Sequence, residues 1–511
     1  MDTYYNMFGR KVEEFSNNAA IKCSNTIYSY QELAVKSCIL EKKLREMNIG
    51  RGSRIAVWTS ESIYFVTCLL TVIKIGGIFI PISYDSPKER IEIILKDCQP
   101  EALMLGDGNQ EIEEFQILDI IETQENSNCS IYNESQLIYG ENVEEKDFCY
   151  IAYTSGTTGE PKGVTITYEG IINFCEAIQS DYHLDHNSRL LPLFPLYFDG
   201  SLGSIFATLY YGGTLVFSKG NCRVGRILRK LLTEEKITHI GCTPTVLTIM
   251  LKEIEKIKKD GGNVYLKSVG LGGEACRIND LKKMMELLPD TSVYNRYGPT
   301  ETTVTALSCL ITRSDIELGK IPIGKPLKNV SAKVVDESYN VVANNTKGEL
   351  CLGGVQVMAG YWNEQELTNA VIKNIDGQLM YCTNDYVIKD ENGTYFFMGR
   401  KGDMIKRNGM RIHLNEVDEA LKSIKIVKDA MCISVVDDDI DISIIVAFVI
   451  MSKRVEITYL RWELAKKIPV YMMPDDYIEV KEFPLSDIGK ADTKKLKKIY
   501  LEKMEGNLNE R

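Results

Sequence analysis

Apolar strand-like and helix-like segments alternate along most of this 511-residue chain, and the alternation limits the folds that it can adopt. Residues 29–47 place apolar side chains at helical spacing after a serine, and residues 54–60 form a short apolar run typical of a buried strand. Residues 62–77 resemble a helix that ends in glycines, and residues 78–83 form another apolar run. This order predicts an α/β fold with parallel sheets.

The pattern changes near residue 320, where short alternating segments with frequent turns predict antiparallel strands, as in residues 331–354. A smaller α/β unit with its own apolar strands follows residue 400. A chain of this length also exceeds what one hydrophobic core supports. We therefore expect an N-terminal domain over residues 1–401 and a C-terminal domain over residues 402–511.

Composition and charge exclude several classes of protein. The formal net charge is −11, from 60 basic and 71 acidic residues, so no basic surplus points to nucleic acid. The 14 cysteines form no CxxC pair, and no histidine stands at metal-ligand spacing with a cysteine, which indicates free thiols in a reducing compartment. The start lacks a signal-peptide pattern, and Lys74 and two glycines interrupt the longest apolar stretch. We expect a cytoplasmic protein with no membrane span.

The stretch "YTSGTTGEPKGV" at residues 153–164 gathers hydroxyl groups, glycines and a lysine directly after the apolar run 148–153. Consecutive backbone N–H groups between glycines form an anion-binding nest, and hydroxyls add donors for phosphate oxygens. A plain surface turn needs no such row of donors. The spacing differs from the Walker loop, because "EPKG" follows Gly159 and Pro161 opposes a helix start at Lys162. The stretch therefore predicts a phosphate loop of another design.

Further motifs follow this loop in a fixed order: "YGPTETT", "GELCLGG", "YCTNDYV", "GRKGDMIKRNGMRI" and "PLSDIGKAD". With "SYQEL" and "VIKIGGIFIPISYDSPKERI" before the loop, nearly the whole chain resembles the adenylate-forming enzymes. That superfamily includes the adenylation domains of nonribosomal peptide synthetases, the acyl- and aryl-CoA ligases and the luciferases. The resemblance implies a large N-terminal domain of packed α/β sheets plus a distorted antiparallel barrel, with a small mobile C-terminal α+β domain.

The resemblance implies a reaction in two steps that activates a carboxylic acid. A carboxylate oxygen attacks the α-phosphate of ATP and expels pyrophosphate, which gives an acyl-adenylate. A thiol then captures the acyl group, either that of coenzyme A or the phosphopantetheine of a carrier protein. ATP and Mg²⁺ are the expected cofactors.

Each motif has an implied task in this reaction. The β- and γ-phosphates are assigned to Thr154, Ser155, Gly156, Thr157, Thr158, Gly159 and Lys162. The remaining nucleotide contacts are assigned to Gly273, Glu274, Asn295, Tyr297, Gly298, Asp385 and Arg400. Within this set, the tyrosine stacks on adenine, the asparagine bonds its edge, the aspartate clamps the ribose hydroxyls and the arginine supports ribose or phosphate. The catalytic set is Lys490, Thr300 and Glu301.

The three catalytic residues are expected to act on different charged groups of the reaction. Glu301 is expected to hold Mg²⁺, Thr300 to reach the α-phosphate, and Lys490 to stabilise charge between carboxylate and phosphate in the transition state. At the predicted hinge the chain departs from the superfamily, because Gly402 stands where an aspartate is usual and Asp403 follows it. Glycine at the pivot and a one-residue shift to Asp403 remain open alternatives.

The segment "PLYFDGSLGSIF" bears on the acid that is activated. Asp199 matches the position that pairs the α-ammonium in amino-acid-activating members, and a carboxylate in an apolar pocket is costly unless a cation meets it. The alternative is that Asp199 points to solvent. The other pocket positions are Gly200, Gly203, Gly241, Gly270, Gly272, Arg296, Val304 and Thr305. Five glycines predict space and the arginine adds a cation, so a large or acidic amino acid is favoured.

The sequence thus predicts a free-standing amino acid ligase that serves a separate carrier protein. Its partners are a small carboxylic acid and that carrier, with no nucleic acid and no membrane. The alternatives are an acyl- or aryl-CoA ligase, a D-alanine–carrier protein ligase, and a catalytically silent scaffold that binds nucleotide. Lys162, Glu301, Asp385 and Lys490 weigh against the scaffold.

Overall fold

The computed structural model describes residues 3–106, 117–119, 134–155, 160–218, 225–401, 404–407, 409–437, 442–453, 455–484 and 493–508. The chain divides into two units. The first comprises Met1–Tyr84, Asp97–Tyr153 and Gly163–Arg400, and the second comprises Asp85–Lys96, Thr154–Lys162 and Lys401–Arg511. The main division therefore falls after Arg400, one residue before the predicted boundary, and two short N-terminal segments group with the C-terminal part.

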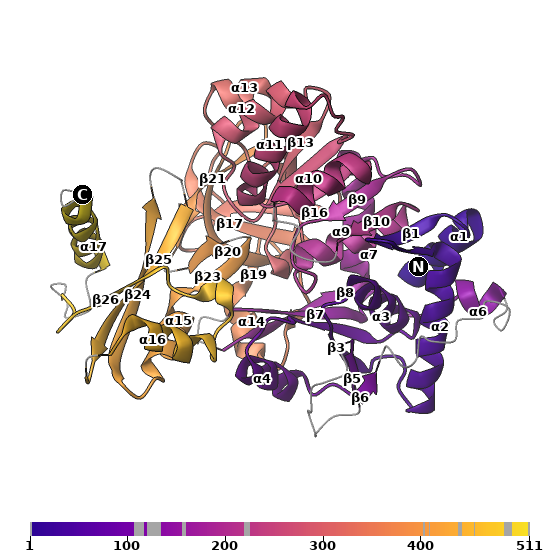
Figure 1. Ribbon diagram of the computed structural model, residues 1–511, viewed down its shortest axis with the longest axis horizontal. Coiled ribbons are helices and arrows are strands. Elements are labelled where there is room, and N and C mark those ends of the chain that lie inside the picture. The colour runs from indigo at the N-terminus through magenta and orange to yellow at the C-terminus, as the bar shows by residue number, and fades with distance from the viewer. Residues whose placement is uncertain are drawn as a thin grey trace. The chain divides into compact units, whose positions relative to one another are not determined.

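A nine-stranded sheet in the order β15-β14-β13-β12-β11-β9-β10-β1-β2 occupies much of the first unit (Figure 1). Its strands are β1 (Ala19–Cys23), β2 (Thr26–Ser29), β9 (Arg189–Pro192), β10 (Thr214–Phe217), β11 (His239–Cys242), β12 (Ser268–Gly272), β13 (Ser292–Tyr297), β14 (Leu307–Leu310) and β15 (Lys325–Pro326). The central strands run parallel, and antiparallel strands close both edges. The predicted parallel α/β pattern is confirmed.

Helices cover both faces of this sheet. One face packs against α10 (Gly225–Glu234), α11 (Pro244–Lys259) and α12 (Ile278–Leu287), with α13 (Arg313–Glu317) beside them. The other face packs against α7 (Tyr168–Ala177) and α9 (Asp199–Tyr210), and α8 (Gln179–Tyr182) follows α7 directly. Since α9 touches β9, β10 and β11, its first turn lies near the carboxyl ends of the parallel strands.

A second, seven-stranded sheet runs in the order β18-β8-β7-β4-β3-β5-β6. Its strands are β3 (Arg54–Trp58), β4 (Ile78–Ile82), β5 (Ala102–Leu105), β6 (Ile117–Asp119), β7 (Phe148–Thr154), β8 (Lys162–Thr167) and β18 (Gly360–Tyr361). It shares one core with α1 (Tyr4–Phe15), α2 (Tyr30–Glu46) and α3 (Ser62–Lys74). Ser29 and Glu32 form a capping box at the start of α2, as the serine before the helical pattern predicts.

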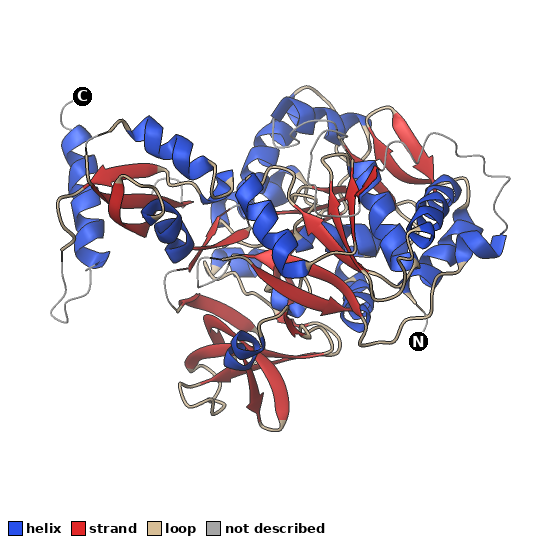
Figure 2. Ribbon diagram, turned by 90° about the horizontal axis from the view of Figure 1, so that it is seen from below, coloured by secondary structure: helices blue, strands red, loops and turns tan. Residues whose placement is uncertain are grey.

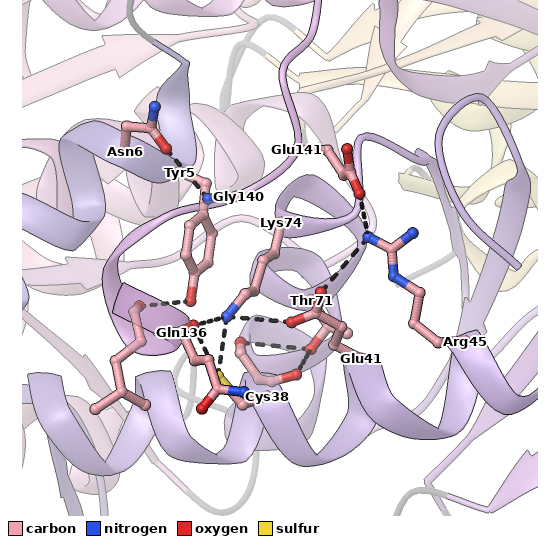
Figure 3. Close-up of polar contacts among 12 residues, drawn as sticks. Tyr5, Asn6, Cys38, Glu41, Arg45, Thr71, Lys74, Gln136, Gly140 and Glu141 are labelled. Atoms are coloured by element: carbon pink, nitrogen blue, oxygen red, sulfur yellow. Dashed lines mark hydrogen bonds and ion pairs between the residues drawn. The ribbon is translucent and has the colours of Figure 1, made fainter. Parts of the chain in front are cut away.

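A buried lysine joins three of the N-terminal helices in this core (Figure 3). Lys74 at the end of α3 lies 2.9 Å from the Cys38 thiol and 3.2 Å from the Glu41 carboxylate, both on α2. Its ammonium also donates to the backbone carbonyl of Gln136 in α6 (Glu134–Ile138). The charge is thus paired and hydrogen-bonded, which is what burial of a lysine requires.

The antiparallel strands predicted after residue 320 are also present. They are β16 (Val330–Val335), β17 (Lys347–Gly354), β19 (Ile372–Ile375), β20 (Gln378–Lys389) and β21 (Tyr395–Arg400), with α14 (Gln365–Val371) between two of them. They curl into a half-barrel in which β17 and β20 pair along most of their length. The fold class expected from the sequence is therefore confirmed.

The second unit contains α4 (Lys88–Cys98) in large part and a small α+β arrangement (Figure 2). The latter consists of the ribbon β22 (Met404–Arg407) and β23 (Met410–His413), the sheet β24 (Val427–Asp437), β25 (Ile442–Met451) and β26 (Asp476–Glu479), and the helices α15 (Leu414–Lys422), α16 (Ile457–Ala465) and α17 (Thr493–Leu508). Within the described ranges, no helix is both long enough and apolar enough to cross a membrane.

Candidate active site

The predicted phosphate loop connects β7 to β8, which are neighbours in the seven-stranded sheet. Thr154 ends β7 and Lys162 begins β8, while Gly156, Thr157, Thr158 and Gly159 lie outside the described residues. The Thr154 hydroxyl is buried without a hydrogen-bond partner among the described residues. A buried orphan donor at the loop's start fits a polar ligand. Lys490, Gly402 and Asp403 also lie outside the described residues.

Three residues predicted to bind nucleotide form one buried cluster. The Tyr297 hydroxyl at the end of β13 donates to Asp385 Oδ2 at 2.5 Å. Arg400 Nη1 lies 2.9 Å from Asp385 Oδ1, and the two residues stand opposite each other on β21 and β20. The Asp385 side chain is 0% exposed and that of Arg400 is 9% exposed. Two strands and a strand end thus bring together side chains that are 103 residues apart.

Several polar atoms of this cluster lack hydrogen bonds within the described structure. They are Asp385 Oδ1, Arg400 Nε and Arg400 Nη1, because the ion pair does not have hydrogen-bond geometry. Ribose hydroxyls are donors that suit the carboxylate oxygen, and ribose or phosphate oxygens are acceptors that suit the guanidinium. The residues present therefore fit a nucleotide. Asn384, where the superfamily has glycine, adopts a left-handed φ of 59°, which asparagine tolerates better than most residues.

Glu301 lies in a short 3₁₀ turn, η2 (Thr300–Thr302), and is completely buried. The Tyr361 hydroxyl donates to its Oε1 at 2.8 Å. Burial is the main cause that raises the pKa of Tyr361, and the negative charge of Glu301 raises it further. The described residues contain no cluster of three metal-ligating side chains. One carboxylate is nevertheless a donor that suits Mg²⁺ when phosphates supply the other oxygens. Thr300, the other catalytic candidate in this turn, is also buried.

The other predicted nucleotide residues make internal contacts. The Glu274 carboxylate accepts from the backbone N–H and hydroxyl of Thr245, in the first turn of α11. Asn295 donates to the Pro322 carbonyl at 2.7 Å. Gly273 has a φ of 87°, and a Cβ at Gly298 would lie 2.5 Å from the Val304 carbonyl oxygen, so both positions need glycine. Their roles toward ATP remain predictions.

Asp199 begins α9 and is 5% exposed, so the alternative that it points to solvent is wrong. It lies near Tyr150 of β7, whose pKa is raised first by burial and then by the Asp199 charge. A buried carboxylate at this place is a suitable partner for an ammonium group.

Neighbouring atoms approach the pocket glycines closely. A Cβ on Gly203 would lie 2.9 Å from a Val304 methyl, and one on Gly270 would lie 2.3 Å from Arg296 Nη1. Equivalent approaches at Gly200, Gly241 and Gly272 are 3.0, 3.2 and 3.1 Å. The glycines thus admit close neighbours, and the space for a large or acidic amino acid stays a prediction.

A polar clamp that the motifs did not reveal holds the segment with the last two pocket positions. The buried Gln356 amide donates to the backbone carbonyls of Thr302, Thr303 and Thr305, the last at 2.8 Å. Thr303 and Val304 both have positive φ values, 52° and 67°, which is strained for β-branched residues. A glutamine within the apolar segment "GGVQVMAGYW" was the available signal for this clamp.

Arg296 was predicted to line the pocket, but its neighbours on α8 were not. Its guanidinium carbon lies 3.7 Å from the centre of the Tyr182 ring, and its Nε lies 3.6 Å from Asp181 Oδ2. The side chains of Arg296 and Asp181 are 8% and 11% exposed. The segment "SDYHLDH" gave no motif that identifies these contacts.

Family models match both parts of the chain. The model described as AMP-binding enzyme matches residues 8–362, and the model described as AMP-binding enzyme C-terminal domain matches residues 416–490.

The chain is similar to curated relatives that are much longer than it and to one of about its own length. Tyrocidine synthase 3 of Brevibacillus parabrevis is 31% identical over 97% of the chain, which spans only 8% of that protein. Zwittermicin A synthase ZmaJ of Bacillus cereus is 30% identical over 96% of the chain and 94% of its own length.

Solved structures share the fold. The o-succinylbenzoate CoA synthetase MenE of Bacillus subtilis superposes with a TM-score of 0.83 at 20% identity, covering 96% of this chain and 98% of MenE. An artificially fused adenylation–PCP di-domain, NpsA-ThdA from Klebsiella oxytoca, gives a TM-score of 0.82 at 19% identity and covers 93% of each chain.

Proposed function

The chain belongs to the AMP-binding enzymes and is an adenylate-forming ligase, and from this premise we propose that it activates an amino acid and passes it to a carrier-protein thiol. ATP supplies the adenylyl group. The proposal adds two points to the family assignment, namely the amino group on the acid and the carrier as the acceptor of the acyl group.

In the first step, a carboxylate oxygen of the amino acid bonds to the α-phosphorus of ATP while the bond to pyrophosphate breaks. The cluster of Tyr297, Asp385 and Arg400 orients the ribose through its orphan atoms. Glu301 is the carboxylate that would hold Mg²⁺, which neutralises the polyphosphate. Lys490 is the predicted cation at the reacting carboxylate and phosphate. In the second step, the thiolate of the acceptor attacks the acyl carbon and AMP leaves.

The buried Asp199 carboxylate carries the choice of an amino acid. We assign Asp199 to the acid pocket because it is buried at the start of α9, a helix that packs against the nine-stranded sheet. A substrate ammonium would pair with that charge.

The similarity to Tyrocidine synthase 3 and the fold shared with an adenylation–PCP di-domain support a carrier protein as acceptor. MenE, a CoA synthetase, has the same fold, so the acceptor needs its own test. A D-alanine–carrier protein ligase is a special case of the same reaction, and a substrate panel includes it.

Substrate-dependent exchange of labelled pyrophosphate into ATP tests the proposal. The panel holds the common amino acids, D-alanine, and aryl and fatty acids, and the activated acid is then offered to a phosphopantetheinylated carrier protein or to coenzyme A. We expect exchange with an amino acid and thioester formation on the carrier. Exchange only with acids that lack an amino group would contradict the amino-acid substrate. Thioester formation on coenzyme A alone would contradict the carrier protein as acceptor.

A further inference from the structure

The structure around Arg296 narrows the substrate class, and this inference rests on the proposed activation of an amino acid. We propose that the substrate's side chain ends in a primary carboxamide, as in asparagine or glutamine, which bonds to Arg296 and Asp181 side by side.

Arg296 has donors with nothing to bond. Its Nε and Nη2 are buried without a hydrogen-bond partner among the described residues, although the side chain is 92% buried. The nearest carboxylate atom, Asp181 Oδ2, lies 3.6 Å from Nε, which is beyond hydrogen-bond range. Buried guanidinium donors are seldom left unpaired, so a ligand that offers an acceptor fits this place.

Asp181 is held by other groups. Its Oδ2 accepts from the Ser308 hydroxyl at 2.5 Å, and its Oδ1 accepts from the Ser180 hydroxyl at 3.1 Å. Two carboxylate oxygens have about four acceptor sites, so each can still accept another donor. Asp181 and Arg296 therefore present an acceptor and a donor side by side.

This pair lies on the face of the sheet that α9 covers. Tyr182, whose ring supports the guanidinium, has its hydroxyl 3.2 Å from the place where a Cβ of Gly241 would be, and the Ser204 hydroxyl of α9 lies 3.3 Å from the same place. Ser204 is five residues after Asp199, about 7.5 Å along the helix. An amino acid held at Asp199 by its ammonium group can thus direct its side chain toward Arg296.

Charge and hydrogen bonding distinguish a carboxamide side chain from a carboxylate and from an aliphatic side chain at this place. The charges of Arg296 and Asp181 cancel, and His239 beside Tyr182 is neutral at pH 7, because burial lowers its pKa to about 4. A carboxamide accepts from Arg296, donates to Asp181 and adds no charge. A carboxylate would face the Asp181 oxygens with acceptors only, and an aliphatic group would leave the buried donors unpaired.

Pyrophosphate exchange with isosteric amino acids tests this class. Wild-type enzyme is given asparagine and glutamine, aspartate and glutamate, and leucine and methionine as aliphatic isosteres. We expect kcat/KM for the better amide to exceed its aliphatic isostere at least about 10²-fold and its acid at least about tenfold, because a site built for hydrogen bonds rejects analogues that lack them. Preference for an acid, an aliphatic or any other amino acid would overturn the inference and leave the proposed function standing. Exchange only with acids that lack an amino group would overturn both.

Two variants test the assigned partners through selectivity rather than activity alone. Arg296→Met should reduce the amide-to-aliphatic ratio to near one, and Asp181→Asn should raise the acid-to-amide ratio at least about tenfold, because it removes the repelling carboxylate. Asp185→Asn changes a nearby exposed carboxylate and should leave both ratios unchanged. Equal losses for all substrates in folded variants would contradict the roles of Arg296 and Asp181. If a variant does not fold, the wild-type panel still decides.

Discussion

Two buried arginine–aspartate pairs lie in the first unit, and they differ in how their charges meet. Arg400 and Asp385 stand opposite each other on adjacent antiparallel strands, with 2.9 Å between Nη1 and Oδ1. Arg296 and Asp181 come from β13 and α8, and Arg296 Nε lies 3.6 Å from Asp181 Oδ2. The same residue types therefore form a contact pair in one place and a separated pair in the other.

The difference follows from the elements that carry the residues. Strand register fixes Asp385 against Arg400, so strand pairing itself holds the two side chains together. The guanidinium of Arg296 instead rests on the Tyr182 ring, and serine hydroxyls satisfy Asp181. We infer that the contact pair positions a ligand through its outer atoms, while the separated pair keeps an arginine donor and an aspartate acceptor available side by side for one ligand group.

The largest expected effect comes from breaking the contact pair. Arg400→Met should lower the free energy of unfolding by about 3–5 kcal/mol, because Asp385 is 0% exposed and would keep a buried charge without its cation. Urea unfolding measures this loss. The double variant Arg400→Met with Asp385→Asn should recover part of it, and the absence of any recovery would show that packing rather than charge holds the cluster.

The next largest effect should be a loss of stability at low pH that comes from His239, a buried histidine beside Tyr182. His239 has a folded-state pKa of about 4, lowered mainly by burial, against an unfolded value near 6.5. The neutral histidine contributes its full stability above about pH 6.5, and this stability is lost as the pH falls toward 4. At pH 5 the loss should reach about 2 kcal/mol relative to His239→Gln. Urea unfolding at pH 7.5 and 5 measures it, with exposed His186→Gln as control; equal pH slopes for all three proteins would contradict the assignment.

Removing the Gln356 clamp should have a smaller effect than either of these changes. Gln356→Met keeps the length of the side chain and removes the amide that bonds three carbonyls of the strained segment from Thr302 to Thr305. We expect a loss of about 1–3 kcal/mol and a raised KM for the acid, because unpaired buried carbonyls favour another backbone conformation. An unchanged KM would show that the segment keeps its conformation without the amide.

The smallest stability effect is expected at the separated pair. Arg296→Met should cost about 1–2 kcal/mol, less than Arg400→Met, because Asp181 keeps its two hydroxyl donors. The same substitution at two buried arginines makes this a matched comparison by urea unfolding. A loss at Arg296 equal to or greater than that at Arg400 would remove the distinction between the two pairs.

The sequence predicted those features that depend on local signals. Ser29 and Glu32 mark the start of α2, the apolar runs give the strands, and the motif order locates Asp199 and Asp385. Contacts made by packing were not predictable in this way. Gly270 shows that a side chain is missing, but only the fold shows that Arg296 fills the space and that Asp181 lies beside it.

The central claim, that this enzyme activates an amino acid through Asp199, is tested most directly by pyrophosphate exchange in one matched set. Wild type and Asp199→Ala are each measured with the best amino acid and with its des-amino analogue. Loss of the carboxylate should lower kcat/KM for the amino acid by about 10²–10³-fold, since a buried ammonium loses its partner at about 3–5 kcal/mol. The des-amino analogue should be little affected or improved. A wild-type enzyme that prefers the des-amino acid, or a variant that loses activity equally with both, would contradict the claim.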